Sequence, residues 1–180
     1  MRKVSVVGTS GSGKTTVGRK LAAALGVPYV ELDALHHIGP NWTEASAEEL
    51  KEKVARAIAG DGWVVDGNYE TKIGDLVVER ADTLVWLDLP LRVSLARLWQ
   101  RTSRRIRDDV ELWGGNKESW KSAVWGRESL FVWAIRSHVR RKRTLPARLA
   151  AHPHLRVVRL RSQAEVDAWL ATHSPPSTKG

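Results

Sequence analysis

Short apolar runs alternate with longer amphipathic segments along this chain, and this alternation predicts strands separated by helices. Each short run is nearly continuous and rich in Val, Leu or Trp, as in strands that are buried on both faces of a sheet. The predicted strands cover residues 4–7, 28–32, 63–65, 83–87 and 157–160. Their order with the helices favours right-handed crossovers and a mostly parallel sheet with helices on both faces.

The amphipathic segments predict five helices, because apolar residues recur in them at helical spacing. Thr43 is the predicted N-cap of the second helix, and Ser162 is the predicted N-cap of the last one. The helices are expected over residues 15–25, 44–59, 91–105, 127–143 and 163–170. We expect residues 106–126 to be irregular, since glycines and tryptophans interrupt the helical spacing there.

Residues 8–15 read Gly-Thr-Ser-Gly-Ser-Gly-Lys-Thr and match G-x-x-x-x-G-K-[ST], the phosphate-binding loop. The loop lies between a predicted strand and a predicted helix, which distinguishes it from a flexible turn. Glycines let backbone N–H groups approach a phosphate, Lys14 can reach the β and γ phosphates, and Thr15 can bind Mg²⁺. The residues predicted to bind a nucleoside triphosphate here are Gly8, Ser10, Gly11, Ser12, Gly13, Lys14, Thr15 and Thr16.

Three carboxylates follow predicted strands, at the sheet edge where ligands bind in folds of this kind. Asp66 is the candidate second acid near Mg²⁺, although Asp-Gly-Asn is also a favourable turn sequence. Asp33 is placed to orient an acceptor hydroxyl and take its proton, and its alternative role is to cap a short helical turn. Asp88 is interpreted as a cap for the helix that begins at Leu91.

Arg97, Arg101 and Arg105 recur at every fourth position and therefore share one helix face. We predict that they close on the phosphates as part of a lid at about residues 101–128, because a guanidinium binds phosphate oxygens in a bidentate way. A solvated basic face is the alternative. Arg161 lies in the loop after the fifth predicted strand, at the sheet edge where ligands bind, and is a predicted nucleotide-binding residue.

The net charge of +9 is unevenly distributed, with −3 over residues 1–90 and +13 over residues 91–161. Such a basic half fits either a polyanionic nucleotide or nucleic acid. The run at residues 140–143 suits a helix C-terminus, and whether the basic segment 136–148 binds DNA stays open. His36 and His37 have no third ligand at metal-binding spacing, so they are interpreted as lining an acceptor pocket or as exposed.

The length of 180 residues suits one domain, which we place at residues 1–172, followed by a disordered tail at 173–180. The absence of cysteine excludes disulfides and is compatible with the cytoplasm. No apolar run is long enough to cross a membrane. We expect a cytoplasmic protein that is a monomer or a homodimer.

The phosphate loop and residues 31–35, 63–69 and 87–90 together resemble the bacterial topology-modulation proteins, a family related to adenylate kinases and to shikimate- and gluconate-type kinases. The resemblance covers about residues 1–170. It implies a P-loop kinase-like three-layer α/β/α sandwich with a five-stranded parallel sheet and a helical lid, and ATP as the nucleotide. Asp66-Gly67-Asn68-Tyr69 stands where adenylate kinases carry Asp-Gly-Phe-Pro-Arg, so the arginine that holds an acceptor phosphate is missing.

These observations predict a Mg²⁺-dependent P-loop phosphotransferase that moves the γ-phosphoryl group of ATP to a small acceptor bearing a hydroxyl. The predicted catalytic residues are Lys14, Asp33, Arg97, Arg101 and Arg105, and the predicted metal ligands are Thr15 and Asp66. A nucleoside monophosphate kinase and a nucleic-acid-associated regulatory ATPase are the alternatives. A third alternative is a nucleotide-binding module without turnover.

Overall fold

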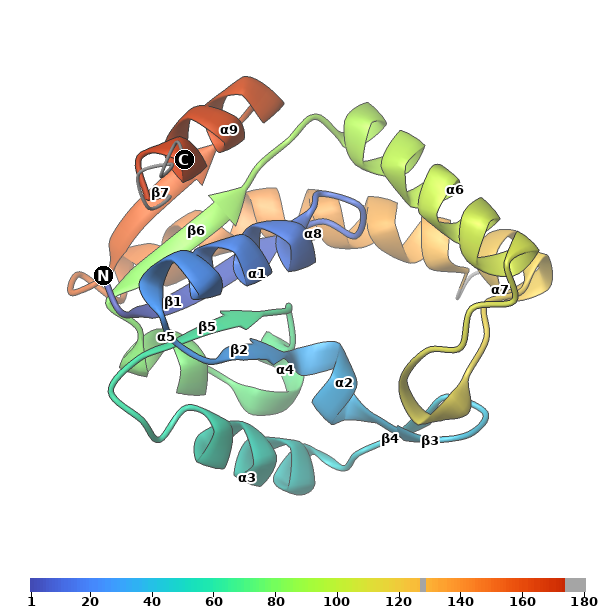
Figure 1. Ribbon diagram of the computed structural model, residues 1–180, viewed down its shortest axis with the longest axis horizontal. Helices are drawn as coiled ribbons and strands as arrows, with labels where there is room; N and C mark the ends of the chain where they lie inside the picture. Colours follow the sequence, from blue (N-terminus) through green and yellow to red (C-terminus); the bar gives the residue numbers. More distant parts are fainter. Residues whose placement is uncertain (127–128, 174–180) are drawn as a thin grey trace, which may run out of the picture.

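The computed structural model describes residues 1–126 and 129–173. Its centre is a parallel sheet of five strands in the order β2-β5-β1-β6-β7 (Figure 1). These strands are β1 (Lys3–Gly8), β2 (Tyr29–Glu31), β5 (Trp63–Asp66), β6 (Thr83–Leu87) and β7 (Arg156–Leu160). The five predicted strands are all present, and the predicted α/β/α sandwich is confirmed.

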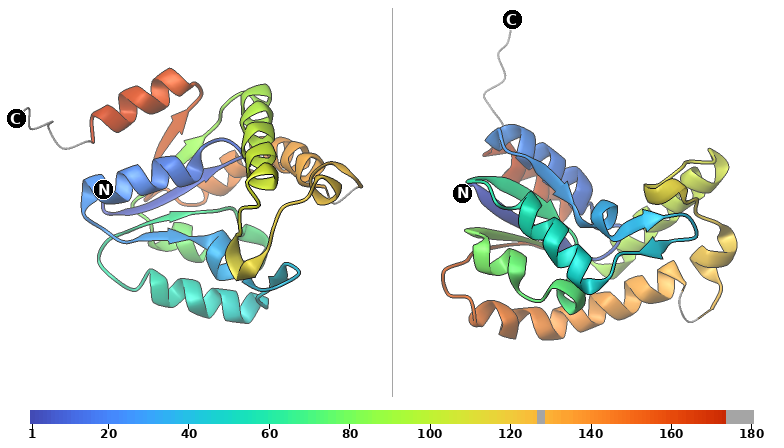
Figure 2. Two further views of the ribbon diagram at one scale, coloured as in Figure 1. Left: turned by 45° about the vertical axis from the view of Figure 1, so that its right-hand side comes forward. Right: turned by 90° about the horizontal axis from the view of Figure 1, so that it is seen from below.

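Helices cover both faces of this sheet (Figures 1 and 2). Successive side chains of a strand point to opposite faces, so Val6 belongs to one apolar cluster and Val7 to the other. The first cluster includes side chains of α1 (Lys14–Leu25) and α9 (Gln163–Ala171). The second includes side chains of α3 (Ala47–Ala57), α4 (Glu70–Ile73), α5 (Leu76–Arg80) and α8 (Leu130–Ala150).

The carboxyl ends of the strands face a group of elements that stands away from the sheet (Figure 1). Helix α6 (Leu91–Arg107) leads to a short 3-10 turn, η1 (Trp113–Gly115), and to α7 (Trp120–Val124). On the other side, α2 (Leu32–His36) is followed by a small antiparallel hairpin of β3 (His37–Gly39) and β4 (Thr43–Glu44). The predicted irregular segment therefore contains two short helical elements.

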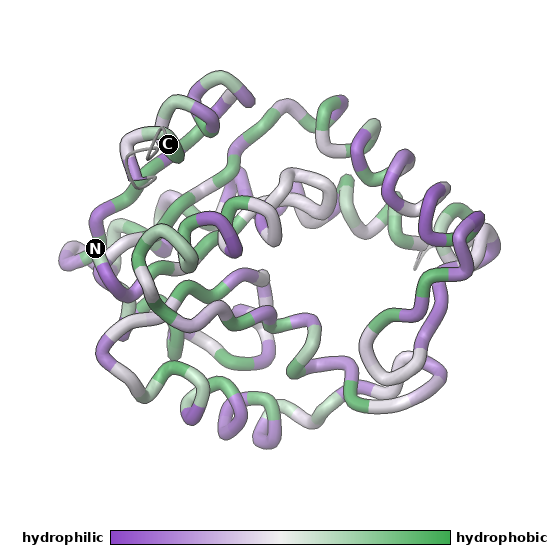
Figure 3. Tube along the Cα trace, viewed as in Figure 1, coloured by the Kyte–Doolittle hydropathy of each residue, from purple (hydrophilic) through white to green (hydrophobic). Residues whose placement is uncertain are grey.

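The hydropathy pattern agrees with these layers, since the strands of the sheet are largely hydrophobic and the outer side of α3 is hydrophilic (Figure 3). Along helix α6, hydrophobic and hydrophilic residues alternate. Within the described part of the chain, no helix is both long and apolar enough to cross a membrane.

Three sequence predictions about helix ends are wrong. Helix α8 ends at Ala150 rather than at residue 143, so the basic run 140–143 lies inside the helix and not at its C-terminus. Asp88 does not cap α6: its carboxylate accepts hydrogen bonds from Nε and Nη2 of Arg159, at 3.0 and 2.6 Å. Thr43 lies in β4, and the N-cap of α3 is Ser46. The predicted start of α8 at Arg127 lies outside the described residues, as does the predicted tail at 173–180 except for its first residue.

The cap of α3 predicts a difference in stability between two single substitutions. Ser46 Oγ accepts the N–H of Glu49 at 3.1 Å, and Glu49 accepts the N–H of Ser46 at 3.0 Å, which is a complete capping box. We expect Ser46→Ala to lower the free energy of unfolding by about 1 kcal/mol. Thr43→Ala, the matched control, should have a smaller effect in the same urea denaturation experiment. Equal effects would contradict this assignment of the cap.

Candidate active site

The phosphate-binding loop joins β1 to α1, and its glycines adopt conformations that other residues rarely take. Gly13 is the N-cap of α1 with a φ of 95°, and Gly11 has a φ of 83°. A Cβ atom on Gly11 would lie 2.1 Å from the carbonyl oxygen of Ser94. The loop thus needs glycine at position 11 for both its backbone conformation and its close packing against α6.

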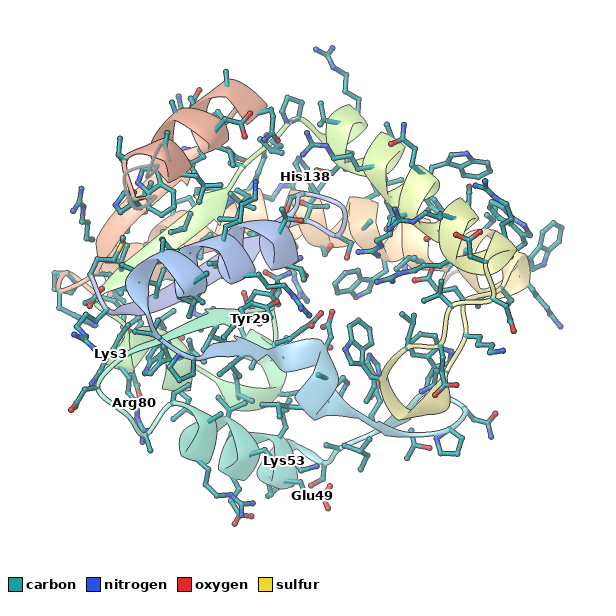
Figure 4. All side chains as sticks on the ribbon, in the orientation of Figure 1. Lys3, Tyr29, Glu49, Lys53, Arg80 and His138 are labelled. Atoms are coloured by element: carbon teal, nitrogen blue, oxygen red, sulfur yellow. The ribbon has the colours of Figure 1, made fainter. Side chains whose placement is uncertain are left out.

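Two side chains from distant parts of the chain hold this loop in place. Asn68 accepts the N–H of Gly8 at 3.2 Å and donates to the carbonyl of the same residue at 2.8 Å. On another side, Thr9 Oγ1 and His138 Nδ1 form a buried hydrogen bond of 2.8 Å. His138 and Tyr29 lie on two sides of α1 in Figure 4. Burial lowers the pKa of His138, so its imidazole is held in the neutral form.

Lys14, Thr15 and Asp66 lie together at the start of α1 and the end of β5. Tyr29 Oη donates a 2.7 Å hydrogen bond to Asp66 Oδ2. Burial raises the pKa of Asp66, while the Lys14 ammonium and hydrogen bonds from Tyr29 and Thr15 act in the opposite direction. Burial likewise lowers the pKa of Lys14. A hydroxyl and a carboxylate side by side supply the oxygen donors that Mg²⁺ prefers, so Thr15 and Asp66 fit this ion.

Asp33 lies in the first turn of α2, and its side chain does not cap that helix. Its Oδ1 instead accepts a 2.7 Å hydrogen bond from Tyr69 Oη. The alternative interpretation of Asp33 as a helix cap is therefore wrong. Asp33 lines a cavity of about 550 Å³ together with Lys14, Thr15 and Asp66. The structure thus brings the predicted acceptor residue to the predicted phosphate and metal site.

The three predicted arginines of α6 do not act as one group. Arg101 and Arg105 line the cavity, and Arg105 forms a 2.8 Å ion pair with Glu118. Arg97 instead donates to Gln163 Oε1 at 2.8 Å, at the start of α9. The reason is the helix rise, which separates Arg97 from Arg105 by about 12 Å along the axis even though they share a face.

Helix α8 contributes an arginine that the sequence prediction did not single out. Arg141 is only 7% exposed, and its Nε and Nη1 have no hydrogen-bond partner among the described residues. Burial is the main cause of the lowered pKa of Lys14, and the positive charge of Arg141 lowers it further. Arg141 therefore lies near Lys14 of the phosphate loop. A buried guanidinium with open donors is suited to an anionic ligand, because unpaired buried charges are costly.

His36, His37 and Glu44 each bring a possible metal-binding atom to within 4.8 Å of the others. The expectation that the histidines have no third ligand nearby is therefore wrong, since the hairpin supplies Glu44. Lys72 Nζ, however, donates to Glu44 Oε2 at 2.7 Å and lies 3.3 Å from His36 Nε2. That hydrogen bond from Lys72 lowers the pKa of Glu44, and burial lowers the pKa of His36. In this structure the Lys72 ammonium is the cation that contacts Glu44 and His36.

The remaining predicted nucleotide-binding residues lie around the loop and after β7. Ser10 lines the cavity, Thr16 is exposed on α1, and the Oγ of buried Ser12 has no hydrogen-bond partner in the described part of the chain. Arg161 is exposed, and its N–H donates to Glu165 Oε2 at 2.9 Å. Its role in binding the nucleotide stays a prediction.

Several residues of the site could not be found from the sequence alone. Asn68 and Tyr69 are the exceptions: they lie two and three residues after Asp66, and their position after a predicted strand was a usable signal. Tyr29, His138 and Arg141 carried no comparable signal. They reach the site because β2 and α8 pack beside the loop, which is a property of the tertiary structure.

Comparison with known proteins agrees with this geometry. A family model for shikimate kinase matches residues 10–57. A shikimate kinase of Sulfurihydrogenibium is 32% identical over 111 residues, which cover 54% of this chain and 67% of that protein. The chain belongs to the P-loop kinases related to shikimate kinase. A cytidylate kinase of Fervidobacterium nodosum is 33% identical to this P-loop kinase over 81 residues, or 41% of this chain and 36% of that protein.

Solved structures of P-loop kinases share the fold. A shikimate kinase from Acinetobacter baumannii in complex with shikimate aligns with a TM-score of 0.58 at 15% identity, over 96% of this chain and 90% of that one. A gluconokinase from Sinorhizobium meliloti aligns with a TM-score of 0.51 at 20% identity, over 95% and 92%. The matched segments span between about a third and two thirds of the curated relatives' own lengths, as the 36% and 67% above illustrate. The resemblance to topology-modulation proteins stays a prediction.

Proposed function

We propose that this P-loop kinase transfers the γ-phosphoryl group of ATP to a hydroxyl group of a small acceptor, with Mg²⁺ at Thr15 and Asp66. The observation that carries the proposal is the single cavity that Asp33 shares with Lys14, Thr15 and Asp66. Phosphoryl transfer asks the protein mainly to position two oxygens in line and to stabilise charge. One cavity that holds both a phosphate-binding group and an acceptor-binding carboxylate meets this requirement.

The residues divide into three tasks in this mechanism. Asp33 orients the acceptor hydroxyl and takes its proton, while the hydrogen bond from Tyr69 fixes the carboxylate. Lys14 and the loop N–H groups stabilise charge on the β and γ phosphates. Arg101 and Arg105 reach the cavity from α6 and stabilise the transferred group. Thr15 and Asp66 would hold Mg²⁺, which would supply positive charge beside the phosphates.

A nucleic-acid-associated ATPase is less well supported, because part of the basic charge is used inside the protein. Arg148 pairs with Glu70 at 3.4 Å and also with Asp75, and Arg159 pairs with Asp88 at 2.6 Å. Arg141 is buried. These arginines bind the protein's own carboxylates or face its interior, and they do not present a basic surface to DNA.

A nucleoside monophosphate acceptor is the second candidate. The cytidylate kinase relative favours it, and Arg101, Arg105 and Arg140 all line the cavity in which an acceptor phosphate would lie. The missing arginine after Asp66 favours a hydroxyl acceptor without such a phosphate.

The test is ATP consumption with Mg²⁺ across nucleosides, nucleoside monophosphates, sugar acids, cyclic hydroxy acids and duplex DNA. We expect at least one small hydroxyl compound to stimulate consumption and to give a phosphorylated product by mass spectrometry. Stimulation by a monophosphate with a nucleoside diphosphate as product would favour the second candidate. Stimulation by DNA alone, without a phosphorylated product, would contradict a kinase.

A further inference from the structure

A row of aromatic rings extends from Asp33 toward the tip of the lid. Tyr69, whose hydroxyl donates to Asp33, has its ring centroid 4.6 Å from that of His36. The His36 and His37 ring centroids are in turn 4.8 Å apart. Asp33 and these three rings line the same cavity.

The row continues with two tryptophans from different segments. Trp42, from the loop of the β3–β4 hairpin, packs edge-on against His37 at 5.2 Å, and Trp113, from η1, lies nearly parallel to His37 at 5.9 Å. The five residues of this row all line the cavity, and we call them the aromatic wall: His36, His37, Trp42, Tyr69 and Trp113.

The backbone at Trp42 is held in an unfavourable conformation. Asn41 and Trp42 have φ angles of 56° and 57°, in the left-handed region that bulky residues avoid. The buried side chain of Asn116 stabilises this turn, because it accepts the N–H of Trp42 at 2.7 Å and donates to the carbonyl of Gly39 at 2.8 Å. Strain that the surroundings enforce at a cavity-lining residue points to a role in ligand binding.

The lid tip packs directly on this hairpin, backbone against backbone. Gly114 has a φ of 66°, and a Cβ atom on it would lie 2.5 Å from the carbonyl oxygen of Gly39. Both Figure 1 and Figure 2 show the segment after α6 beside the hairpin. The contact holds Trp113 against His37 of the hairpin, so the aromatic wall is assembled from both segments.

We propose that the aromatic wall binds a planar ring of the acceptor, so that the substrate class is a hydroxyl compound with an aromatic or heteroaromatic ring, and not a saturated sugar acid. This inference rests on the proposed function, which sets the hydroxyl at Asp33. Ring faces bind other planar rings by stacking. The Lys72, Glu44 and His36 groups already bond to one another, so the polar atoms that the two wall histidines leave open are their buried Nδ1 atoms, which have no hydrogen-bond partner among the described residues.

The test compares matched ligands by calorimetry, with Mg²⁺ and a non-hydrolysable ATP analogue bound. Adenosine, cytidine and aryl alcohols carry a planar ring, whereas ribose, cyclohexyl alcohols and gluconate do not. We expect a ring compound to bind at least 10-fold more tightly than its saturated counterpart. Trp113→Leu should weaken that binding about 10-fold. Trp120→Leu, which alters an exposed tryptophan packed on Trp99, is the matched control and should leave binding unchanged.

Saturated compounds that bind as tightly as the ring compounds, or more tightly, would overturn this inference, and so would the absence of binding of any ring compound. Equal affinities of the wild type and Trp113→Leu for a ring compound would also contradict it. Phosphoryl transfer is measured on the same compounds. Ring binding that depends on Trp113 but gives no phosphorylated product would contradict the proposed function and leave the assignment of the wall intact.

Discussion

Asp33→Asn is expected to lower the rate of phosphoryl transfer by about 10²- to 10⁴-fold, the usual contribution of a general base. Asparagine keeps the size of the side chain and can still accept the hydrogen bond from Tyr69, so the fold is retained. It does not take the proton of the acceptor hydroxyl. The measurement is kcat with the acceptor that the substrate panel identifies, together with the dissociation constant for ATP by calorimetry.

ATP binding separates the two possible roles of this carboxylate. Because Asp33 belongs to the acceptor side in our proposal, the affinity for ATP should change by less than about threefold. A parallel loss of ATP affinity would show that Asp33 serves the nucleotide. Asp61→Asn, which alters an exposed carboxylate in the loop before β5, is the matched control and should leave both quantities unchanged.

Lys14→Met is expected to lower the rate of phosphoryl transfer by about 10²- to 10³-fold and to weaken ATP binding as well. The reason is that the proposed contacts of the ammonium with the β and γ phosphates exist both in bound ATP and in the transition state. Methionine retains the unbranched stem and removes the charge. Burial, which lowers the pKa of Lys14, also indicates that this side chain is poorly hydrated before the nucleotide arrives. A negatively charged phosphate then compensates for the missing water.

The control for Lys14 is available on the same helix. Lys20→Met alters an exposed lysine of α1 and should change neither ATP affinity nor transfer. Thermal denaturation of both variants checks that the helix is intact. If Lys14→Met kept transfer and ATP affinity within about threefold of the wild type, the assignment of residues 8–15 as the phosphate site would be wrong.

The features that the sequence predicted well are those that local patterns determine. The five strands contain short runs of apolar residues, and the phosphate loop is a fixed motif between a strand and a helix. The N-cap of α3 could have been predicted from the sequence, since Ser46 and Glu49 have the spacing of a capping box. The choice of Thr43 overlooked that signal, and the hairpin that contains Thr43 is too short to show a pattern of its own.

What sequence patterns did not predict depends on contacts between distant segments. Periodicity places Arg97 and Arg105 on one face of α6 but does not say which turn of the helix reaches the cavity. The hydrogen bonds of Tyr29 with Asp66 and of Tyr69 with Asp33 join residues 37 and 36 positions apart. Such pairs are fixed only when the strands and helices pack.

We expect helix α8 to limit how the predicted lid could open. Its Leu130 lines the cavity, its His138 bonds to the phosphate loop, and its Leu145 is buried in the core, so one helix of about 31 Å, with Pro146 near its C-terminal end, connects all three sites. Bending within this helix would break the contact with Thr9. The pivots of opening would therefore lie outside α8. Gly126, with a φ of 94°, and Asp109, which follows the end of α6 with a φ of 48°, are two positions where the backbone departs from helical geometry and where we expect such a pivot.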